Sequence, residues 1–536
     1  MRLTPGFFTP AERTTARRLA ELSLVNPFLP RRVQLESEIL GRAGPTEDDS
    51  WSLAFDPAHK RSEVTEAILA RLTALVAPRP VPALLTDADA ITYEQVARFY
   101  LFLRFQRDFH RAATEARAEG AATTLRMTCW GPFLVEALRC MRAPGRPRPT
   151  EAEVAHLFAV LFQIRRAFVH IYKHLVGRSP VVIRLRAAVW ESIFTHDLDR
   201  YFASRYRRMG DLTTLITGPS GSGKELVARA IGLSRYVPFV PGTQAFAENF
   251  AASFHPLNLS ALAPTLIESE LLGHKRGAFT GALADHAGWL EVCSPHGTVF
   301  LHEIGELDMA VQVKLLRILQ TRVFQRVGDS VARRFQGKII AATNRDLGAA
   351  IAAHRFRADL YYRLCADILT TPSLREQQAG SPGDLALWIE YIARQMGEEE
   401  PAPLVAEVLA WVEEHLGPEY PWPGNFRELE QCVVNIWIRK SYRPVGRSPL
   451  ALEAGLAGPT WLEAARAGTL TAEQLLAGYC ARIFAQIGSY RAAGRRLGLD
   501  WRTTRRYVEQ ARNHPAAGEH RPPPAERTDD DGTLAR

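Results

Sequence analysis

The sequence predicts a multidomain chain with a mainly α N-terminal domain, an α/β P-loop domain with a helical lid, and an all-α C-terminal domain of helix-turn-helix type. In residues 1–176 the apolar positions follow helical spacing. From 177 to 440, short apolar strands alternate with helices, which is typical of a parallel α/β sheet. Residues 469–512 are helical again and rich in arginine. With 536 residues and 46% hydrophobic content, the chain can bury several separate cores.

Two helix starts in the N-terminal region have the spacing of a capping box, in which a Thr and a Glu or Gln three residues later bond each other's backbone N–H groups. The first is Thr92 with Gln95, and the second is Thr150 with Glu153. The helix after Thr92 is apolar on two faces, so we expect it to be buried. The helix after Thr150 keeps its apolar spacing as far as Gly177, which suits a C-cap.

Composition argues against several classes of protein. The first residues lack the apolar segment of a secretory signal, and no uncharged apolar run reaches the ~20 residues that span a bilayer. We therefore expect a soluble, cytoplasmic protein with no membrane partner. The six cysteines form no CxxC pair, so neither a disulfide framework nor a zinc site is indicated. His170 and His174 could share a metal, but without a third ligand a packing pair is favoured, and no metal residue is predicted.

A glycine-rich loop follows the first strand of the α/β region and opens a helix, which is the context in which such loops bind phosphates. Its backbone N–H groups and the helix N-terminus would face the phosphates, and its lysine would reach the outer ones. A flexible Gly/Ser turn is the alternative interpretation. A Glu then stands where other P-loops have the Ser or Thr that holds magnesium. The predicted nucleotide-binding residues here are Gly218, Pro219, Ser220, Gly221, Ser222, Gly223, Lys224 and Glu225.

Two further strands end in polar residues. The segment "GTVFLHEIGEL", residues 297–307, is an apolar strand that ends on His302 and Glu303. The strand "KIIAAT" ends beside Thr343 and Asn344, which could sense the nucleotide from the neighbouring strand. Between the two nucleotide motifs lies "GAFTGA", which by itself could be an ordinary glycine-rich turn with one exposed Phe.

Six motifs together carry a specific resemblance. "GPSGSGKE", "LIESELLGHKRGAFTGA", "GTVFLHEIGEL", "AATNRDL", "FRADLYYRL" and "YPWPGNFRELE" follow one another in the order found in bacterial sigma-54-dependent transcription activators, also called enhancer-binding proteins. The chain resembles the AAA+ domain of this family over residues 177–440, with a lid at about 384–440. The hexapeptide "GAFTGA" is the most diagnostic element, because other AAA+ proteins lack it.

The resemblance implies roles for individual residues in an ATP-binding ring. Glu303 would orient the attacking water, and Asn258 would switch that glutamate. Arg357 and Arg363 would reach into the neighbouring subunit's site, which implies a homo-oligomer, expected to be a hexamer. Arg427 would be the sensor arginine of the lid; for each arginine a surface salt bridge is the alternative. The residues implied to contact sigma-54 are Gly277, Ala278, Phe279, Thr280, Gly281 and Ala282.

The sequence departs from the family pattern in two places. Residues 241–256 are longer than the usual connection, which could be a subfamily loop. The larger departure is His302, which replaces the Walker B Asp, the main protein group that organises Mg²⁺ in this family. Magnesium prefers oxygen ligands, whereas imidazole suits softer ions. We therefore expect a weakened magnesium site and slow or absent hydrolysis with nucleotide binding kept; the alternative is that phosphate oxygens and water hold the metal adequately.

The C-terminal segment resembles the Fis-like DNA-binding domain of the same family. Two helices joined by a tight turn at Gly498 follow the helix-turn-helix pattern, and the chain's net charge of +8 concentrates here. A solvated basic helix is the alternative. Residues 441–468 look like a linker, and 513–536 like a disordered tail. The candidate DNA-binding residues are Arg491, Arg495, Arg496, Arg502, Thr503, Thr504, Arg505 and Arg506.

Taken together, the sequence predicts a sigma-54-dependent transcriptional regulator. The family places signal sensing at the N-terminus, so residues 1–176 are expected to be a regulatory domain whose type the sequence does not identify. The expected partners are the sigma-54 RNA polymerase holoenzyme and double-stranded DNA at an upstream, enhancer-type site. The alternative is a hydrolysis-deficient regulator that binds DNA and nucleotide as a repressor or a mixed-ring partner. An AAA+ motor acting on other substrates is disfavoured by "GAFTGA" and the terminal DNA reader.

Overall fold

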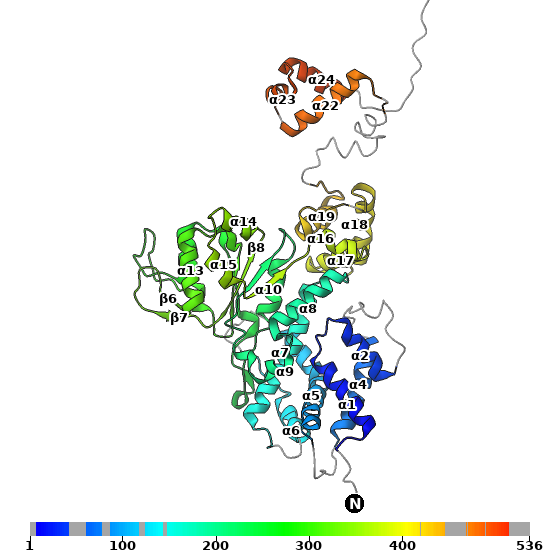
Figure 1. Cartoon of the computed structure of the whole chain (residues 1–536), viewed down its shortest axis with the longest axis vertical. Helices are drawn as coiled ribbons and strands as arrows, with labels where there is room; N and C mark the ends of the chain where they lie inside the picture. The colour runs from blue at the N-terminus through cyan, green and yellow to red at the C-terminus, as the bar shows by residue number, and fades with distance from the viewer. Residues whose placement is uncertain are drawn as a thin grey trace, which may run out of the picture. The chain divides into compact units, whose positions relative to one another are not determined.

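The computed structural model describes residues 7–41, 60–77, 86–116, 124–142, 147–418, 420–444, 468, 470–487 and 489–513. The chain divides into two compact units, Met1–Ser441 and Tyr442–Arg536 (Figure 1). Most of the predicted linker and nearly all of the predicted tail lie outside the described residues.

The N-terminal part of the first unit is helical, as predicted. Its helices up to α7 pack mainly on one another, with α5 in contact with α1, α4, α6 and α7, whereas α8 packs mainly against the α/β domain and the lid. These helices are α1 (Pro10–Leu24), α2 (Pro30–Leu40), α4 (Lys60–Val76), α5 (Asp87–Glu115), α6 (Trp130–Cys140), α7 (Glu151–His174), α8 (Pro180–Phe194) and α9 (Leu198–Ala203).

One predicted helix start is wrong and the other is confirmed. Helix α5 begins six residues earlier than expected, with Thr86 rather than Thr92 as N-cap, and Thr92 lies inside the helix. The Thr92 hydroxyl donates to the carbonyl of Ala88, so it is satisfied within the helix and its spacing to a Gln is no cap signal. Thr150 does cap α7 in a full capping box with Glu153.

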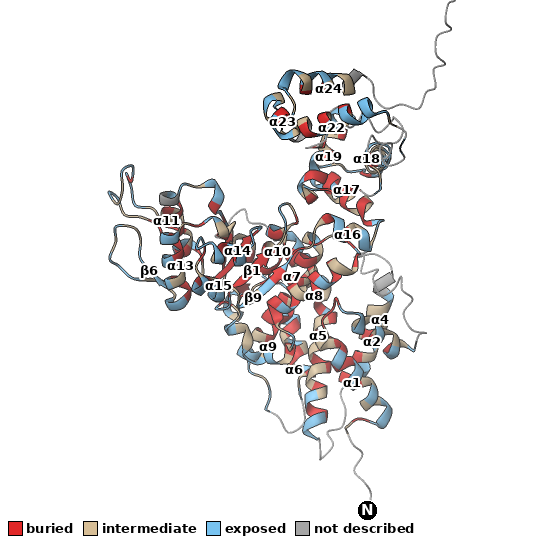
Figure 2. Ribbon diagram, turned by 45° about the horizontal axis from the view of Figure 1, so that its top comes forward, coloured by how far each residue is buried: buried red, intermediate tan, exposed pale blue. Residues whose placement is uncertain are grey.

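Helix α7 forms the middle of the first unit. It packs against α5 on one side and against α10 (Lys224–Gly232) of the α/β domain on another (Figure 1). Among the described residues, α7 is the helix that is long and apolar enough to cross a membrane, but 72% of its most apolar window is buried in the protein. Figure 2 likewise shows α7 as largely buried, so its apolar length is that of a core helix. It ends at His174, and Gly177 follows the cap rather than forming it.

The α/β domain is built on a five-stranded parallel sheet in the order β4-β5-β8-β1-β9. The predicted strands around "TLIT", "GTVFL" and "KIIAAT" are present. Because the strands are parallel, the carboxyl ends of β1, β5 and β8 meet at one edge, where a ligand site is expected. The strands are β1 (Thr214–Thr217), β4 (Phe254–Asn258), β5 (Thr298–His302), β8 (Lys338–Thr343) and β9 (Asp367–Thr370).

Short helices and two small hairpins complete the α/β domain. Helix α13 shares a buried core with β5 and β8 of the sheet and packs against α11 and α15. The additional elements are α11 (Pro264–Leu272), α12 (Trp289–Val292), α13 (Met309–Thr321), α14 (Leu347–Ala352), α15 (Ala358–Leu364), β2 (Phe239–Val240), β3 (Ala245–Phe246), β6 (Val323–Phe324) and β7 (Arg333–Arg334).

Four helices after β9 form the lid. Helix α16 precedes residue 384 and contacts both α17 and α19, so the helical lid starts earlier in the chain than expected. The lid helices are α16 (Leu374–Gly380), α17 (Asp384–Gln395), α18 (Ala402–His415) and α19 (Asn425–Arg439).

The extra residues 241–256 join the α/β domain to the N-terminal helices. They supply part of the β2–β3 hairpin, whose backbone bonds the segment before α6: Met127 N–H donates to Gln244 O, and Phe246 N–H donates to Leu125 O. The Phe246 ring lies 4.6 Å from that of Phe162 on α7. The expectation of a mere subfamily loop therefore understates this segment, because it shares one buried core with the N-terminal helices.

The second unit contains three described helices, α22 (Ala472–Ile487), α23 (Tyr490–Leu497) and α24 (Trp501–Asn513). Each packs against the other two. Gly498 ends α23 in the left-handed conformation, with φ of +69°, and makes the tight turn into α24.

Candidate functional site

The phosphate loop leaves the central strand β1 and opens helix α10. Gly218 and Gly221 have φ of +145° and +74°, and a Cβ on either would lie 2.2 Å from Thr371 Oγ1 or 2.4 Å from Gly424 O, respectively. Only glycine fits these two positions, so the loop can present its backbone N–H groups at the α10 N-terminus. Lys224 bonds the loop's own carbonyls, with Nζ 2.9 Å from Gly218 O and from Pro219 O. Burial lowers the pKa of Lys224.

The lid is attached directly to this loop through Asn425. Its Nδ2 donates to Ser220 O at 2.9 Å, and its Oδ1 accepts from the N–H of Leu374 at 2.8 Å. The Phe426 N–H also donates to Gly221 O. Asn425 is 4% exposed and has a positive φ of 53°, a conformation that Asn tolerates better than most residues. Sequence reasoning singled out the arginine of "GNFREL" and missed this asparagine.

A cavity of about 320 Å³ lies beside the phosphate loop. Its wall combines the loop and α10 (Ser222, Leu226) with the lid (Ile392, Phe426) and the end of α7 (His174). Such an apolar slot next to a phosphate-binding loop fits a flat heterocyclic base. The loop and this cavity together therefore match the two ends of a nucleotide.

His302 stands at the end of β5, in register with Asn258 on β4 and Ala342 on β8. The next residue, Glu303, is left-handed with φ of +60°, and its Oε2 accepts from the N–H of Asn344 at 3.2 Å. Its charge also raises the pKa of Lys224, against the larger effect of burial. The structure thus brings Glu303, Asn344 and Lys224 to one edge of the sheet.

Glu225 and His302 are the two groups at this edge that bear on magnesium binding. Glu225 pairs with Arg229 one turn along α10, at 2.9 Å. The position that should supply a carboxylate at the end of β5 supplies an imidazole, His302. In the ranges that the structure describes, no group of three or more His, Cys, Asp or Glu is arranged to hold a metal. His170 and His174 instead stack within the core, with ring centroids 6.0 Å apart.

Asn258 lies at the same edge, at the end of β4, and Arg427 lies near Lys224, whereas Arg357 and Arg363 lie at the two ends of α15. The Asn258 Oδ1 accepts from the N–H and hydroxyl of Ser260, so it bonds its own turn. Arg357 forms a bidentate pair with Asp359, at 2.7 and 2.9 Å. Arg363, in the last turn of α15, and Arg427, on α19, are exposed. Arg427 lies close enough to Lys224 to lower its pKa slightly.

The "GAFTGA" segment is a tight loop closed by a bond from the Gly277 N–H to Ala282 O, at 2.8 Å. The ring of Phe279 lies edge-on to His274, with centroids 4.9 Å apart, and Ala278 is also partly covered. Thr280 and Gly281 are exposed. Ala282 is 6% exposed and belongs to the base of the loop, which corrects its assignment as a contact residue.

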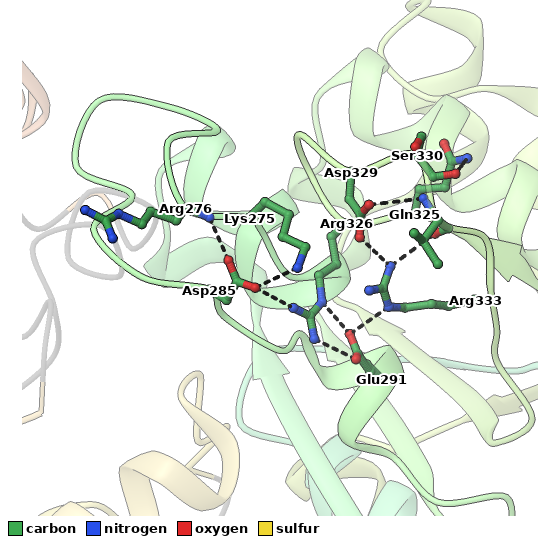
Figure 3. Close-up of polar contacts among 10 residues, drawn as sticks. Lys275, Arg276, Asp285, Glu291, Gln325, Arg326, Asp329, Ser330 and Arg333 are labelled. Atoms are coloured by element: carbon green, nitrogen blue, oxygen red, sulfur yellow. Dashed lines mark hydrogen bonds and ion pairs between the residues drawn. The ribbon is translucent and has the colours of Figure 1, made fainter.

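A network of ion pairs joins the residues that flank this loop to the neighbouring segments (Figure 3). Asp285, at the loop's far end, accepts from Lys275 at 2.7 Å and lies 3.7 Å from Arg326. Arg326 also holds Glu291 at 2.6 Å, and its hydrogen bonds lower the pKa of that carboxyl. Arg333 joins Glu291 from the β6–β7 hairpin at 3.4 Å. Sequence spacing could not reveal this network, because its members come from three separate segments.

The second unit exposes most of the predicted DNA-binding residues. The exposed arginines are Arg491, Arg495, Arg496, Arg502, Arg505 and Arg506. Thr503 is partly exposed, and Arg505 pairs with Glu509 at 2.7 Å. Thr504 is wrong as a base-contact candidate: it is 0% exposed, and its hydroxyl donates to Asp500 O.

Comparison with known proteins gives one family and several relatives. Residues 200–369 match the family described as "Sigma-54 interaction domain". The chain is 41% identical over 227 residues to the anaerobic nitric oxide reductase transcription regulator NorR of Klebsiella pneumoniae (strain 342), covering 42% of this chain and 40% of that protein. It is 42% identical over 286 residues to the Nif-specific regulatory protein of Azotobacter vinelandii, covering 52% and 47%. The chain thus spans less than half the length of these curated relatives.

Among solved structures, NtrX from Brucella abortus aligns with a TM-score of 0.39 and 22% identity, over 71% of this chain and 80% of that one. A parallel sheet with a phosphate loop after its central strand, and a helical lid bonded to that loop, define the class: an AAA+ type P-loop domain. More particularly, residues 200–369 are similar to the sigma-54 interaction domain, and the resemblance to sigma-54-dependent activators is confirmed.

Proposed function

We propose that this protein is a transcriptional regulator that binds ATP and remodels the sigma-54 RNA polymerase holoenzyme into its open complex. The observation that carries the proposal is the exposed tip of "GAFTGA", Thr280 and Gly281, on the same domain as the phosphate loop. Backbone hydrogen bonds and the ion pairs of Arg326 hold the loop rigidly. Because the loop is rigid, a movement of the domain would move the tip as well.

Within one subunit, each group of residues in the proposed site has a separate role. The phosphate loop and Lys224 hold the phosphates, and the cavity beside Phe426 takes the base. Glu303 orients water at the end of β5. When bound, ATP supplies the phosphoryl transfer whose free energy moves the lid and loop. At the two ends of α15, Arg363 is exposed and Arg357 is partly exposed, which leaves both within reach of a neighbouring subunit and supports a homo-oligomeric ring, as a hexamer.

A second candidate function follows from His302. With an imidazole at the end of β5 and Glu225 paired to Arg229, the chain provides poor oxygen ligands for Mg²⁺. The protein would then bind nucleotide and DNA without hydrolysis, as a repressor or as a partner in mixed rings.

We assign DNA binding to the second unit and a cytoplasmic location to the whole protein. Exposed arginines flank the start of α24, including Arg502 and Arg506, which suits phosphate and base contacts in double-stranded DNA upstream of a promoter. Thr503 stays a candidate base contact, whereas Thr504 is excluded as one because it is buried.

The deciding experiment measures open-complex formation on a supercoiled template carrying a sigma-54 promoter, with purified holoenzyme and this protein. We expect open complexes with ATP and none with Lys224→Ala or Thr280→Tyr. Leu283→Ala, at an 86% exposed position just after the loop, is the matched control and should keep activity. Absence of open complexes with ATP, together with retained ADP and DNA binding, would refute remodelling and support the second candidate.

A further inference from the structure

The His302 side chain lies on the face of the sheet that carries α10. Successive side chains of β5 alternate between the two faces. Phe300 packs in the buried cluster that contains residues of α10, whereas Leu301 packs in the cluster on the other face. His302 follows Phe300 by two residues, and the centroids of their rings are 5.8 Å apart. Because α10 begins at the phosphate loop, the imidazole of His302 is on the loop's side of the sheet.

The strand register brings this imidazole close to the phosphate loop. Strand β8 lies between β5 and β1, with His302 opposite Ala342 and Ala342 opposite Ile216. Neighbouring strands are about 4.8 Å apart, so the Cα atoms of His302 and Ile216 are separated by about 10 Å. The loop begins two residues after Ile216, at Gly218. The imidazole and the loop are therefore close enough for one ion to contact both His302 and a bound phosphate.

The imidazole of His302 is available to an ion. Its ring makes no hydrogen bond or ion pair with any residue that the structure describes, and the side chain is partly exposed. The neighbouring oxygen groups are engaged: Glu225 pairs with Arg229 at 2.9 Å, and Asn258 Oδ1 accepts two hydrogen bonds within its own turn. A neutral imidazole keeps one nitrogen as an acceptor. Of the side chains of Glu225, Asn258 and His302, the last is therefore the one that can bind an ion without losing another bond.

An imidazole together with phosphate oxygens selects a different ion from the all-oxygen ligands that hold magnesium. Mg²⁺ requires near-ideal octahedral oxygen coordination and loses water reluctantly. Imidazole nitrogen favours first-row transition metal ions, and the affinity of nitrogen and oxygen sites rises from Mn²⁺ through Fe²⁺ and Co²⁺ to Ni²⁺. These ions also accept phosphate oxygens. The ligands at the end of β5 therefore suit a transition metal ion better than Mg²⁺.

We propose that the nucleotide site binds a divalent first-row transition metal ion in preference to Mg²⁺, with a ring nitrogen of His302 as its protein ligand. The phosphates of the nucleotide and water would supply the other ligands. This inference rests on the proposed nucleotide site and adds the identity of its metal ion. The described residues include no group of three His, Cys, Asp or Glu arranged to hold a metal, so tight binding of the ion should require the nucleotide.

Calorimetric titration of the full chain with ADP measures the metal preference. Titrations are run in EDTA and at equal, saturating concentrations of Mg²⁺, Mn²⁺ or Co²⁺. We expect Co²⁺ to tighten ADP binding about tenfold relative to EDTA and Mg²⁺ to tighten it less than about twofold, because Co²⁺ gains the imidazole ligand and Mg²⁺ does not.

Three variants separate the imidazole from other effects. His302→Gln removes the ligand nitrogen without adding charge, and His302→Asp replaces it with a carboxylate. Both should lose the preference for Co²⁺ over Mg²⁺. His354→Asn is the matched control, because His354 is exposed and has a φ of +55°, which Asn also accepts. This control should bind like the wild type.

Pulsed electron paramagnetic resonance identifies the ligand directly. In the complex with Mn²⁺ and ADP, a coordinated imidazole gives an electron spin echo modulation from ¹⁴N. We expect this modulation in the wild type and in His354→Asn, and its absence in His302→Gln and His302→Asp. His174 also lines the cavity beside the loop, and modulation from that residue would persist in both His302 variants.

The outcomes separate the metal proposal from the nucleotide site. Equal tightening of ADP binding by Co²⁺ and Mg²⁺ in the wild type would overturn the metal proposal, as would ¹⁴N modulation that is absent from the wild type or persists without His302. ADP binding in EDTA would leave the nucleotide site intact in that case. If ADP binds neither in EDTA nor with any of the ions, the nucleotide site is refuted, and the metal proposal is refuted with it.

Discussion

Replacing Phe246 with alanine tests whether the inserted hairpin fastens the N-terminal helices to the α/β domain. Phe246 is 2% exposed, and its ring centroid lies 4.6 Å from that of Phe162 and 5.4 Å from that of Phe239. Removing a buried phenyl ring costs about 3–5 kcal/mol, because the transfer free energy is lost and a cavity remains. The hairpin's backbone bonds are kept in this variant, so the loss falls on side-chain packing.

The assay is hydrogen exchange of the α7 amides around Phe162, combined with the urea midpoint of the full chain. Exchange reports local opening free energy, which is the quantity that this substitution lowers if the two regions share one core. Leu283→Ala, at an exposed position, is the control and should change stability by less than about 0.5 kcal/mol. A loss below about 1 kcal/mol at α7 would refute the shared core.

Three further substitutions probe the site. His302→Asp should raise ATP hydrolysis at least tenfold, because a carboxylate is a better magnesium ligand; equal rates would contradict this. Asn425→Ala should weaken mant-ADP binding about tenfold, because it loses one hydrogen bond from the lid to the phosphate loop and one to Leu374 within the lid, whereas Asn435→Ala, within α19, should not. Burial lowers the pKa of His174 to about 4, so the unfolded state binds more protons between pH 6.5 and 4 and stability falls as pH falls through that window. The urea midpoint of His174→Leu should therefore fall less than that of the wild type between pH 6.5 and 4. Equal falls in the two proteins would contradict this prediction.

The sequence predicts those parts of the site whose residues all lie within one short stretch of the chain. A glycine-rich loop between an apolar strand and a helix has a single compatible geometry, so Gly218 to Lys224 could be placed without the structure. The strand ends at His302 and Thr343 could also be placed near this loop, because parallel strands bring their carboxyl ends to the same edge of the sheet.

The remaining parts depend on contacts between distant segments. Asn425 bonds Ser220 across 205 positions of sequence, and the Arg326 network joins three segments that no periodicity relates. The predictions of Thr92 as a helix cap and of Thr504 as a DNA contact were wrong for one reason. A threonine hydroxyl can donate to the carbonyl four residues earlier, and this bond leaves no trace in the sequence pattern.

The shared core also predicts what deletion of the N-terminal helices does to the α/β domain. Phe239, Phe246 and Phe250 are each 5% exposed or less, and they pack with α7 in one cluster. Deleting residues 1–176 would expose this aromatic patch, so we expect an insoluble or aggregated fragment rather than an unrestrained activator. Deleting the second unit, residues 442–536, should leave a soluble chain that binds mant-ADP, because that unit is compact on its own. A soluble, monomeric fragment 177–441 that binds mant-ADP would show that the α/β domain does not need this shared core.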